Sequence, residues 1–154
     1  MSAKPPGPAD TLGILLLAGT HERAHYAFVL ASAAAALGRA VVLFATNDGC
    51  HALCADWSGL ADAARDAEIQ SRGVAGLAEL RAAARELGVR LIACEAGLAA
   101  ADIAPAALLH DAEIAGVATF FAAIGAGQML TLCAPQALLK RKKMSDPADF
   151  PGGD

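Results

Sequence analysis

Short apolar segments alternate with longer segments of helical periodicity along most of this chain. The apolar segments have the length of strands that are buried on both faces, and they lie at 12–18, 40–46, 89–94, 112–115 and 129–133. The clearest helical segments between them lie at 21–37, 74–87 and 117–124. Strands of this kind, separated by helices, form parallel sheets covered on both sides. We therefore predict an α/β fold, a three-layer α/β/α sandwich with a mainly parallel sheet of about five strands.

The remaining segments carry weaker patterns. Glycines at 38 and 88 are expected to end the two helices that precede them. We expect a short helix at 50–56, an irregular polar excursion at 57–72 and one or two short helices within 98–109. A last helix is predicted at 135–143. The expected organisation is a flexible N-terminus (1–11), a single domain (12–144) and a flexible C-terminal tail (145–154).

Composition narrows the classes of protein that fit this pattern. The 154 residues suffice for one domain. They are 56% hydrophobic but only 5% aromatic, so the core must be built from many small side chains, alanine above all. Charged residues make up 18%, which excludes a disordered chain. The net charge of −4 argues against a nucleic-acid-binding protein, which normally carries a basic face.

One stretch is apolar enough to suggest a membrane span. Residues 114–139 contain no charged side chain and are followed by the basic run 140–143. Gly125, Gly127 and Pro135 interrupt the stretch, however, and a helix, a strand and a second helix account for those breaks. Residues 1–11 lack the apolar core of a secretory signal. We therefore expect no membrane association and a cytoplasmic location, in which thiols stay reduced.

In an open parallel sheet, ligands bind outside the carboxyl ends of the strands. Polar residues and cysteines follow most of the predicted strand ends in this chain. The candidate reactive residues are Cys94, Cys50 and His21. The candidate substrate-binding residues are Gly19, Thr20, Asn47, Glu95, Gly116 and Thr119.

Cys94 is the strongest of these candidates because a buried strand stops there and a helix begins. Backbone N–H groups at such a turn favour an anionic sulfur, whereas the neighbouring Glu95 opposes it. The alternative is a small buried apolar side chain. Cys50 is placed nearer the rim as a second thiol, Cys54 is expected in the core, and Cys133 is expected to be structural.

The histidines allow two interpretations. His21 and His25 are four residues apart and could bind a metal together with Cys50 or Cys94, but no third ligand is evident. We favour His21 as a base or hydrogen-bond donor for a thiolate or persulfide. The chain has no glycine-rich nucleotide loop and no nucleophile elbow. We therefore predict neither a metal nor another cofactor.

Three segments together resemble a known family. They are GILLLAGTHERAHYAFVLASAAAALGRAVVLFAT (13–46), GVRLIACEAGL (88–98) and AEIAGVATFFAAIGAGQMLTL (112–132). Their order and spacing resemble the DsrE/DsrF/DsrH-like superfamily, in the larger branch often labelled peroxiredoxin-like. The resemblance covers most of residues 12–134. The branch usually has a Ser-Met pair shortly after its cysteine, where this chain has Gly97 and Leu98.

The resemblance implies a role in sulfur trafficking. Members carry sulfane sulfur as a cysteine persulfide, exchange it with TusA-like or rhodanese-like proteins, and commonly form homo-oligomers. The carrier cysteine of the family falls on Cys94. The first hypothesis is therefore a sulfur carrier or sulfurtransferase. The alternatives are a non-catalytic module that binds a small ligand or a partner, and a metal- or thiol-dependent redox enzyme.

Overall fold

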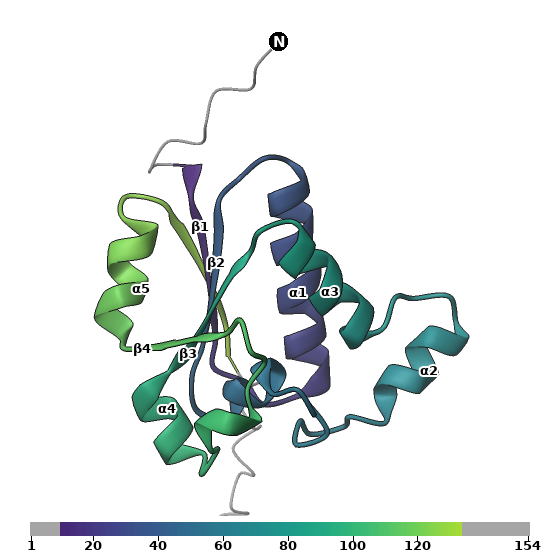
Figure 1. Ribbon diagram of the computed structural model, residues 1–154. Helices are drawn as coiled ribbons and strands as arrows, with labels where there is room; N and C mark the ends of the chain where they lie inside the picture. The colour runs from purple at the N-terminus through teal and green to yellow at the C-terminus, as the bar shows by residue number, and fades with distance from the viewer. Residues whose placement is uncertain (1–9, 134–154) are drawn as a thin grey trace, which may run out of the picture.

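A five-stranded sheet forms the centre of the molecule, and all of its neighbouring strands run parallel. The computed structural model describes residues 10–133. The strands are β1 (Leu12–Leu16), β2 (Val41–Ala45), β3 (Arg90–Cys94), β4 (Glu113–Ala115) and β5 (Gln128–Leu132). Their order across the sheet is β4-β3-β2-β1-β5 (Figure 1). The predicted parallel sheet is thus confirmed.

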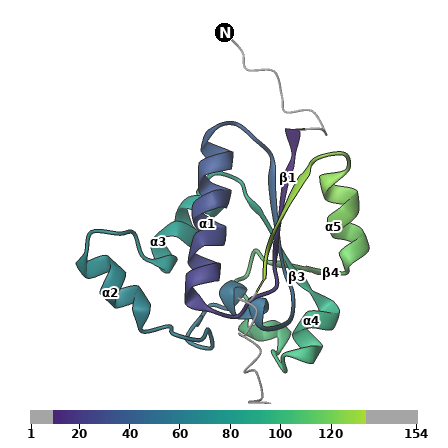
Figure 2. The same ribbon diagram turned by 180° about the vertical axis from the view of Figure 1, so that it is seen from behind.

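Helices cover both faces of this sheet, as Figures 1 and 2 show from opposite sides. On one face lie α1 (His21–Ala36) and α3 (Leu77–Glu86), with α2 (Arg65–Ser71) projecting beside them. On the other face lie α5 (Val117–Ile124) and, at the carboxyl ends of the strands, α4 (Glu95–Ala100). Two short 3₁₀ helices complete the carboxyl edge, η2 (Asn47–Leu53) and η3 (Pro105–Ala107). The prediction of a three-layer α/β/α fold is confirmed.

The larger part of the core lies between the sheet and α1. Ala24, Ala27 and Ala31 of α1 are completely buried, and they face strand residues such as Ile14 and Leu43. Alanine side chains let the helix backbone approach the sheet closely, which explains the alanine-rich composition. The helix ends where predicted, because Gly38 adopts a φ of 84°, a left-handed conformation that suits glycine at a helix C-terminus.

The second part of the core lies between the sheet and α5, and it is built around aromatic rings. Phe44 of β2 stacks on Phe120 of α5 with ring centroids 4.9 Å apart. The other buried members of this cluster are Val42, Ile92, Ile124 and Cys94. The side chain of Cys94 therefore lies on the α5 face of the sheet.

Three segments differ from expectation. The polar stretch 57–72 contains α2, because Asp66 and Ile69 are buried and anchor that segment against the body of the protein. The helix after β3 starts at Glu95, immediately after the strand, rather than at 98. The short helix expected at 50–56 is the 3₁₀ helix η2 and begins earlier. The predicted helix at 135–143 and most of both predicted flexible ends lie outside the described residues.

Within residues 10–133, none of the helices is both long enough and apolar enough to cross a bilayer. Residues 114–133 of the uncharged stretch form part of β4, then α5 and β5, as the glycine breaks predicted. The remainder of that stretch lies outside the described part of the chain.

The aromatic cluster yields a prediction on stability. Phe120 is 1% exposed, so Phe120→Ala leaves a cavity against Phe44 and is expected to lower the free energy of unfolding by about 3–5 kcal/mol. Tyr26 of α1 is 55% exposed and serves as the control, since Tyr26→Ala is expected to lower the free energy of unfolding by less than about 1 kcal/mol. Urea unfolding of both variants checks this. Equal losses of stability would show that Phe120 does not pack as described.

Candidate functional site

Cys94 lies at the junction of β3 and α4. Its backbone is extended, with φ −67° and ψ 122°, and it forms the N-cap of α4. The Sγ atom accepts a hydrogen bond from the backbone N–H of Gly97 at 3.4 Å. Cys94 is 8% exposed, so only a small part of the residue reaches the surface. The sulfur therefore has one backbone donor aimed at it, an arrangement that favours an anionic sulfur.

Gly97 also marks the point where α4 touches the turn between β2 and η2. A Cβ atom on Gly97 would collide with the backbone nitrogen of Asn47 and with Oγ1 of Thr46. Only a glycine permits this approach without displacing one of the two turns. The predicted ligand-binding residue Asn47 is therefore next to the first turn of α4. Gly97 was not among the residues predicted to matter.

Cys50 lies in η2, the 3₁₀ helix that follows β2. It is completely buried, and its Sγ atom donates a hydrogen bond to the backbone oxygen of Ala45, the last residue of β2, at 3.4 Å. Burial raises the pKa of the Cys50 thiol to about 12, although the backbone N–H of Cys94 acts to lower it. The thiol is therefore protonated at neutral pH. The sequence analysis expected Cys50 nearer the rim of the site. The structure instead buries it completely, so that expectation is wrong.

The other two cysteines differ from each other in exposure. Cys54 is 4% exposed and belongs to the core, as predicted, and burial raises the pKa of its thiol. Cys133 was expected to be structural, but it follows the end of β5 and is exposed. The expectation for Cys133 is wrong because β5 is an edge strand that ends at Leu132.

The predicted ligand-binding residues fall into two groups along the carboxyl edge. Gly116 forms the N-cap of α5 and directly follows Ala115, which is the register partner of Cys94. Among residues 10–133, no atom beyond its chain neighbours lies within 4 Å of the position that a Cβ on Gly116 would take, and Thr119 is exposed on the first turn of α5. Glu95 is exposed on α4. These three residues therefore surround the Cys94 end of the sheet.

The second group belongs to the turn between β1 and α1. Thr20 forms the N-cap of α1, and its Oγ1 accepts a hydrogen bond from the N–H of Arg23 at 3.4 Å. Gly19 lies against Asp48 of η2, where a Cβ atom would collide with the Asp48 side chain. This turn thus contacts η2, whereas the hydrogen bonds of Thr20 do not reach Cys94.

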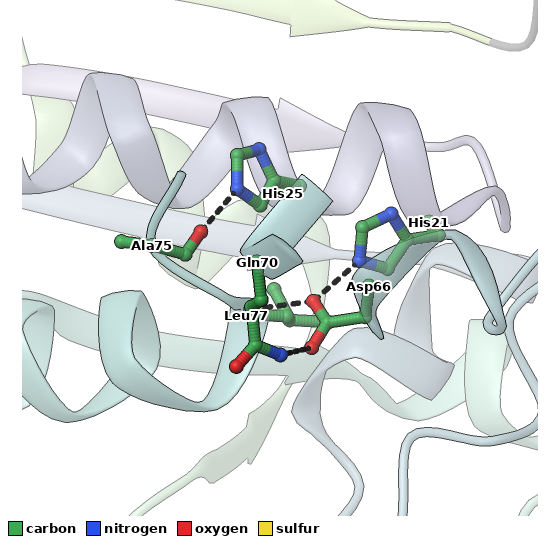
Figure 3. Close-up of polar contacts among 6 residues, drawn as sticks. All are labelled: His21, His25, Asp66, Gln70, Ala75 and Leu77. Atoms are coloured by element: carbon green, nitrogen blue, oxygen red, sulfur yellow. Dashed lines mark hydrogen bonds and ion pairs between the residues drawn. The ribbon is translucent and has the colours of Figure 1, made fainter. Parts of the chain in front are cut away.

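His21 takes part in a buried network on the α1 face (Figure 3). Its Nε2 lies 2.7 Å from Oδ1 of Asp66. The same Oδ1 accepts a hydrogen bond from the backbone N–H of Leu77 at 2.7 Å. Oδ2 of Asp66 accepts a hydrogen bond from Gln70 at 2.6 Å. Burial acts to raise the pKa of Asp66, but the donors on Leu77, His21 and Gln70 outweigh it and hold that pKa below its usual range. Asp66 is therefore ionised, and Nε2 of His21 carries the proton.

The structure therefore pairs His21 with Asp66, and none of the hydrogen bonds of His21 connects it to Cys94 or Cys50. Asp66, which the sequence analysis did not single out, fixes the tautomer of His21. The Nδ1 atom of His21 is buried and has no partner among residues 10–133. The network ties α2 to the start of α1 and to the start of α3.

Residues 21–25 match the H-E-x-x-H spacing of zinc-binding helices. In such a helix the two histidines need free ring nitrogens that converge on the metal. Here Nε2 of His21 binds Asp66, and Nε2 of His25 donates to the backbone oxygen of Ala75 at 2.8 Å. In the described part of the chain, no three potential ligands converge on one point. The two histidines are thus not grouped with Cys50 or Cys94.

Comparison with known proteins identifies the family of this chain. The model of the DsrE/DsrF-like family matches residues 12–132, which is most of the chain. The chain belongs to the DsrE/DsrF-like family. It is 29% identical over 142 residues to the sulfur carrier protein DsrE2 of Allochromatium vinosum, in an alignment that covers 71% of this chain and 89% of that protein. The family resemblance noted in the sequence is confirmed.

The network around Asp66 yields a prediction on stability and pH. Asp66→Ala leaves the N–H donors of His21 and Leu77 without their acceptor. We expect it to lower the free energy of unfolding by about 1–3 kcal/mol at neutral pH. The pKa of Asp66 is lower in the folded protein than in the unfolded chain, where it is about 4. Ionised Asp66 therefore stabilises the fold fully at pH values above about 4. This stabilisation is lost as the pH falls through the lower pKa of Asp66 in the folded protein. The parent and Asp66→Ala are therefore expected to approach the same stability in acid.

The matched control is Glu68→Ala on the same helix. Glu68 pairs with Arg72 at the surface, where an ion pair contributes little, so this variant is expected to match the parent. Urea unfolding between pH 3 and pH 7 provides the measurement. If Asp66→Ala and Glu68→Ala were equally stable at pH 7, the buried network would not hold α2 as described.

Proposed function

We propose that this protein carries sulfane sulfur as a persulfide on Cys94 and passes it to a thiol of a partner protein. The observation that carries the proposal is the position of the Cys94 sulfur, at a strand end and within reach of the Gly97 N–H. Membership of the DsrE/DsrF-like family and similarity to a protein named as a sulfur carrier support it.

The proposed chemistry consists of two thiol exchanges that need no external oxidant or reductant. The Cys94 thiolate attacks the outer sulfur of a donor persulfide, and the donor leaves as a thiolate. The acceptor thiolate then attacks the outer sulfur on Cys94, which in turn leaves as a thiolate. In both steps one sulfur–sulfur bond forms and one breaks. The Gly97 N–H would stabilise the negative charge on the Cys94 sulfur before it takes up sulfur and again after it has passed the sulfur on.

The other thiols are assigned lesser roles. Cys50 is protonated and buried, so we propose that it does not accept sulfur during turnover. Cys54 is buried as well. Cys133 is exposed and free, which makes it the competing thiol that an experiment must control.

The proposed partners come from the family resemblance, and the proposed location is one in which thiols stay reduced. A persulfide carrier needs a donor and an acceptor, and we propose TusA-like or rhodanese-like proteins in the cytoplasm, where free thiols persist. We also propose that the protein forms a homo-oligomer. Apolar side chains exposed on β4 and α5 favour such an association, and they are Ile114, Val117 and Phe121.

A second candidate function is non-catalytic binding of a small ligand. The observation that favours it is a cavity of about 470 Å³ beside η2 and the segment that follows α4. His51, Asp56 and Asp102 line this cavity, and Cys94 does not. A protein of this class would use its thiols only for packing.

The sulfur-carrier proposal is tested by mass spectrometry after incubation of the full chain with a persulfide donor. The parent is expected to gain about 32 Da, the mass of one sulfur atom, and Cys94→Ser is expected to gain none. Cys133→Ser is the control and is expected to gain the same mass as the parent, because the proposal assigns the added sulfur to Cys94 alone.

Two outcomes would contradict the proposal. Equal sulfur uptake by Cys94→Ser and the parent would show that Cys94 is not the carrier. No uptake by any variant, together with slow and equal alkylation of Cys94 and Cys133, would favour the binding module instead.

A further inference from the structure

We propose that Cys50 is a positioning residue for Cys94: its thiol fills the end of the β2/β3 ladder and holds the carrier cysteine in place. The inference rests on the proposed function, because it assigns a role in that reaction. It differs from the role of a second reactive thiol, such as a resolving thiol, which would follow from the sequence-based choice of Cys50 as a candidate reactive residue. A resolving thiol exchanges bonds with the carrier, whereas a positioning thiol keeps its proton and its partners throughout.

The geometry of the strand ends carries this inference. Ala45 and Ala93 are register partners at the end of the parallel β2/β3 ladder, and Cys94 follows Ala93 directly. The Cys50 Sγ donates to the backbone oxygen of Ala45 at 3.4 Å and is completely buried there. The thiol thus lies at the end of the β2/β3 ladder. The backbone N–H of Cys94 acts to lower the pKa of this thiol.

The remainder of η2 holds the thiol in that position. Gly49 lies against the backbone oxygen of Leu16 at the end of β1, where a Cβ atom would collide with it. On the other side, the Thr46–Asn47 backbone contacts Gly97, the residue that donates to the Cys94 sulfur. Residues 46–50 therefore touch the turn that follows Cys94 at Gly97, and η2 also packs against β3.

The chemical state of Cys50 suits this role. Burial raises its pKa to about 12, so the thiol keeps its proton and remains a donor to Ala45 at neutral pH. A protonated thiol is also a poor nucleophile. Cys50 therefore does not attack a persulfide on Cys94, and the carried sulfur stays available for the partner.

Cys54 provides a matched control within the same segment. It is 4% exposed, and its thiol also donates to a backbone oxygen, that of Cys50, at 3.6 Å. No hydrogen bond of the Cys54 side chain reaches β3. A general loss of packing would affect both cysteines, whereas a positioning role affects Cys50 alone.

The experiment compares Cys50→Ala, Cys50→Ser and Cys54→Ala, each in a full chain that carries Cys133→Ser. The first measurement is hydrogen exchange of the Cys94 and Gly97 amides by NMR, without any sulfur donor. In Cys50→Ala these amides are expected to exchange about three- to tenfold faster than in the background protein, because one buried hydrogen bond at the strand end is lost. Cys54→Ala is expected to leave them unchanged, and Cys50→Ser, which keeps a donor, is expected to restore them.

The second measurement is the rate of sulfur loading on Cys94, expected to fall about three- to tenfold in Cys50→Ala and to recover in Cys50→Ser. If Cys50→Ala does not fold, Cys50→Val fills the site without a donor and takes its place. Equal amide exchange in Cys50→Ala and Cys54→Ala, or no rescue by serine, would overturn the proposal. Because exchange is measured without sulfur, a failure of Cys94 to carry sulfur leaves the test of Cys50 intact.

Discussion

The contact between the α4 turn and the β2–η2 turn is the constraint on which the candidate site depends. All five strands run in the same direction, so their carboxyl ends meet at one edge of the sheet. At that edge Gly97 allows α4 to reach the Thr46–Asn47 backbone, and its N–H reaches the Cys94 sulfur. A side chain at Gly97 would separate the two turns and remove that donor from the sulfur. The cores on both faces of the sheet hold the strand ends that these turns connect.

Much of the fold could be predicted from the sequence because β1 and β2 are buried apolar segments and the longer helices α1 and α3 show a helical pattern. The alanines of α1 indicated a closely packed helix, and Ala24 and Ala27 are completely buried. The prediction was wrong for α2, since residues 65–71 are mostly polar and exposed. That helix is held by the bonds of Asp66 to residues distant in the sequence, which no local pattern reveals.

The candidate site was predicted less completely than the fold. The strand-end rule assigned Cys94 and Gly116 to the carboxyl edge, because it needs only the strand boundaries. That the two are neighbours follows from the pairing of β3 with β4, which the sequence did not predict. The same rule could not tell that Cys50 points into the end of the ladder, since burial depends on how η2 packs. It also suggested His21 as a partner for the thiol, although a distant carboxylate, Asp66, engages that ring. The sequence did contain one signal that could have indicated the role of Gly97. It is a glycine in the first turn of a helix that begins directly after Cys94.

The proposed carrier function requires that sulfur resides on Cys94 and not on the more exposed Cys133. The most direct measurement is peptide mapping by tandem mass spectrometry of protein purified from its native host without reductant. The account predicts an added mass of about 32 Da on the peptide that contains Cys94 and none on the peptide that contains Cys133. An added sulfur confined to the Cys133 peptide, with Cys94 unmodified, would contradict it.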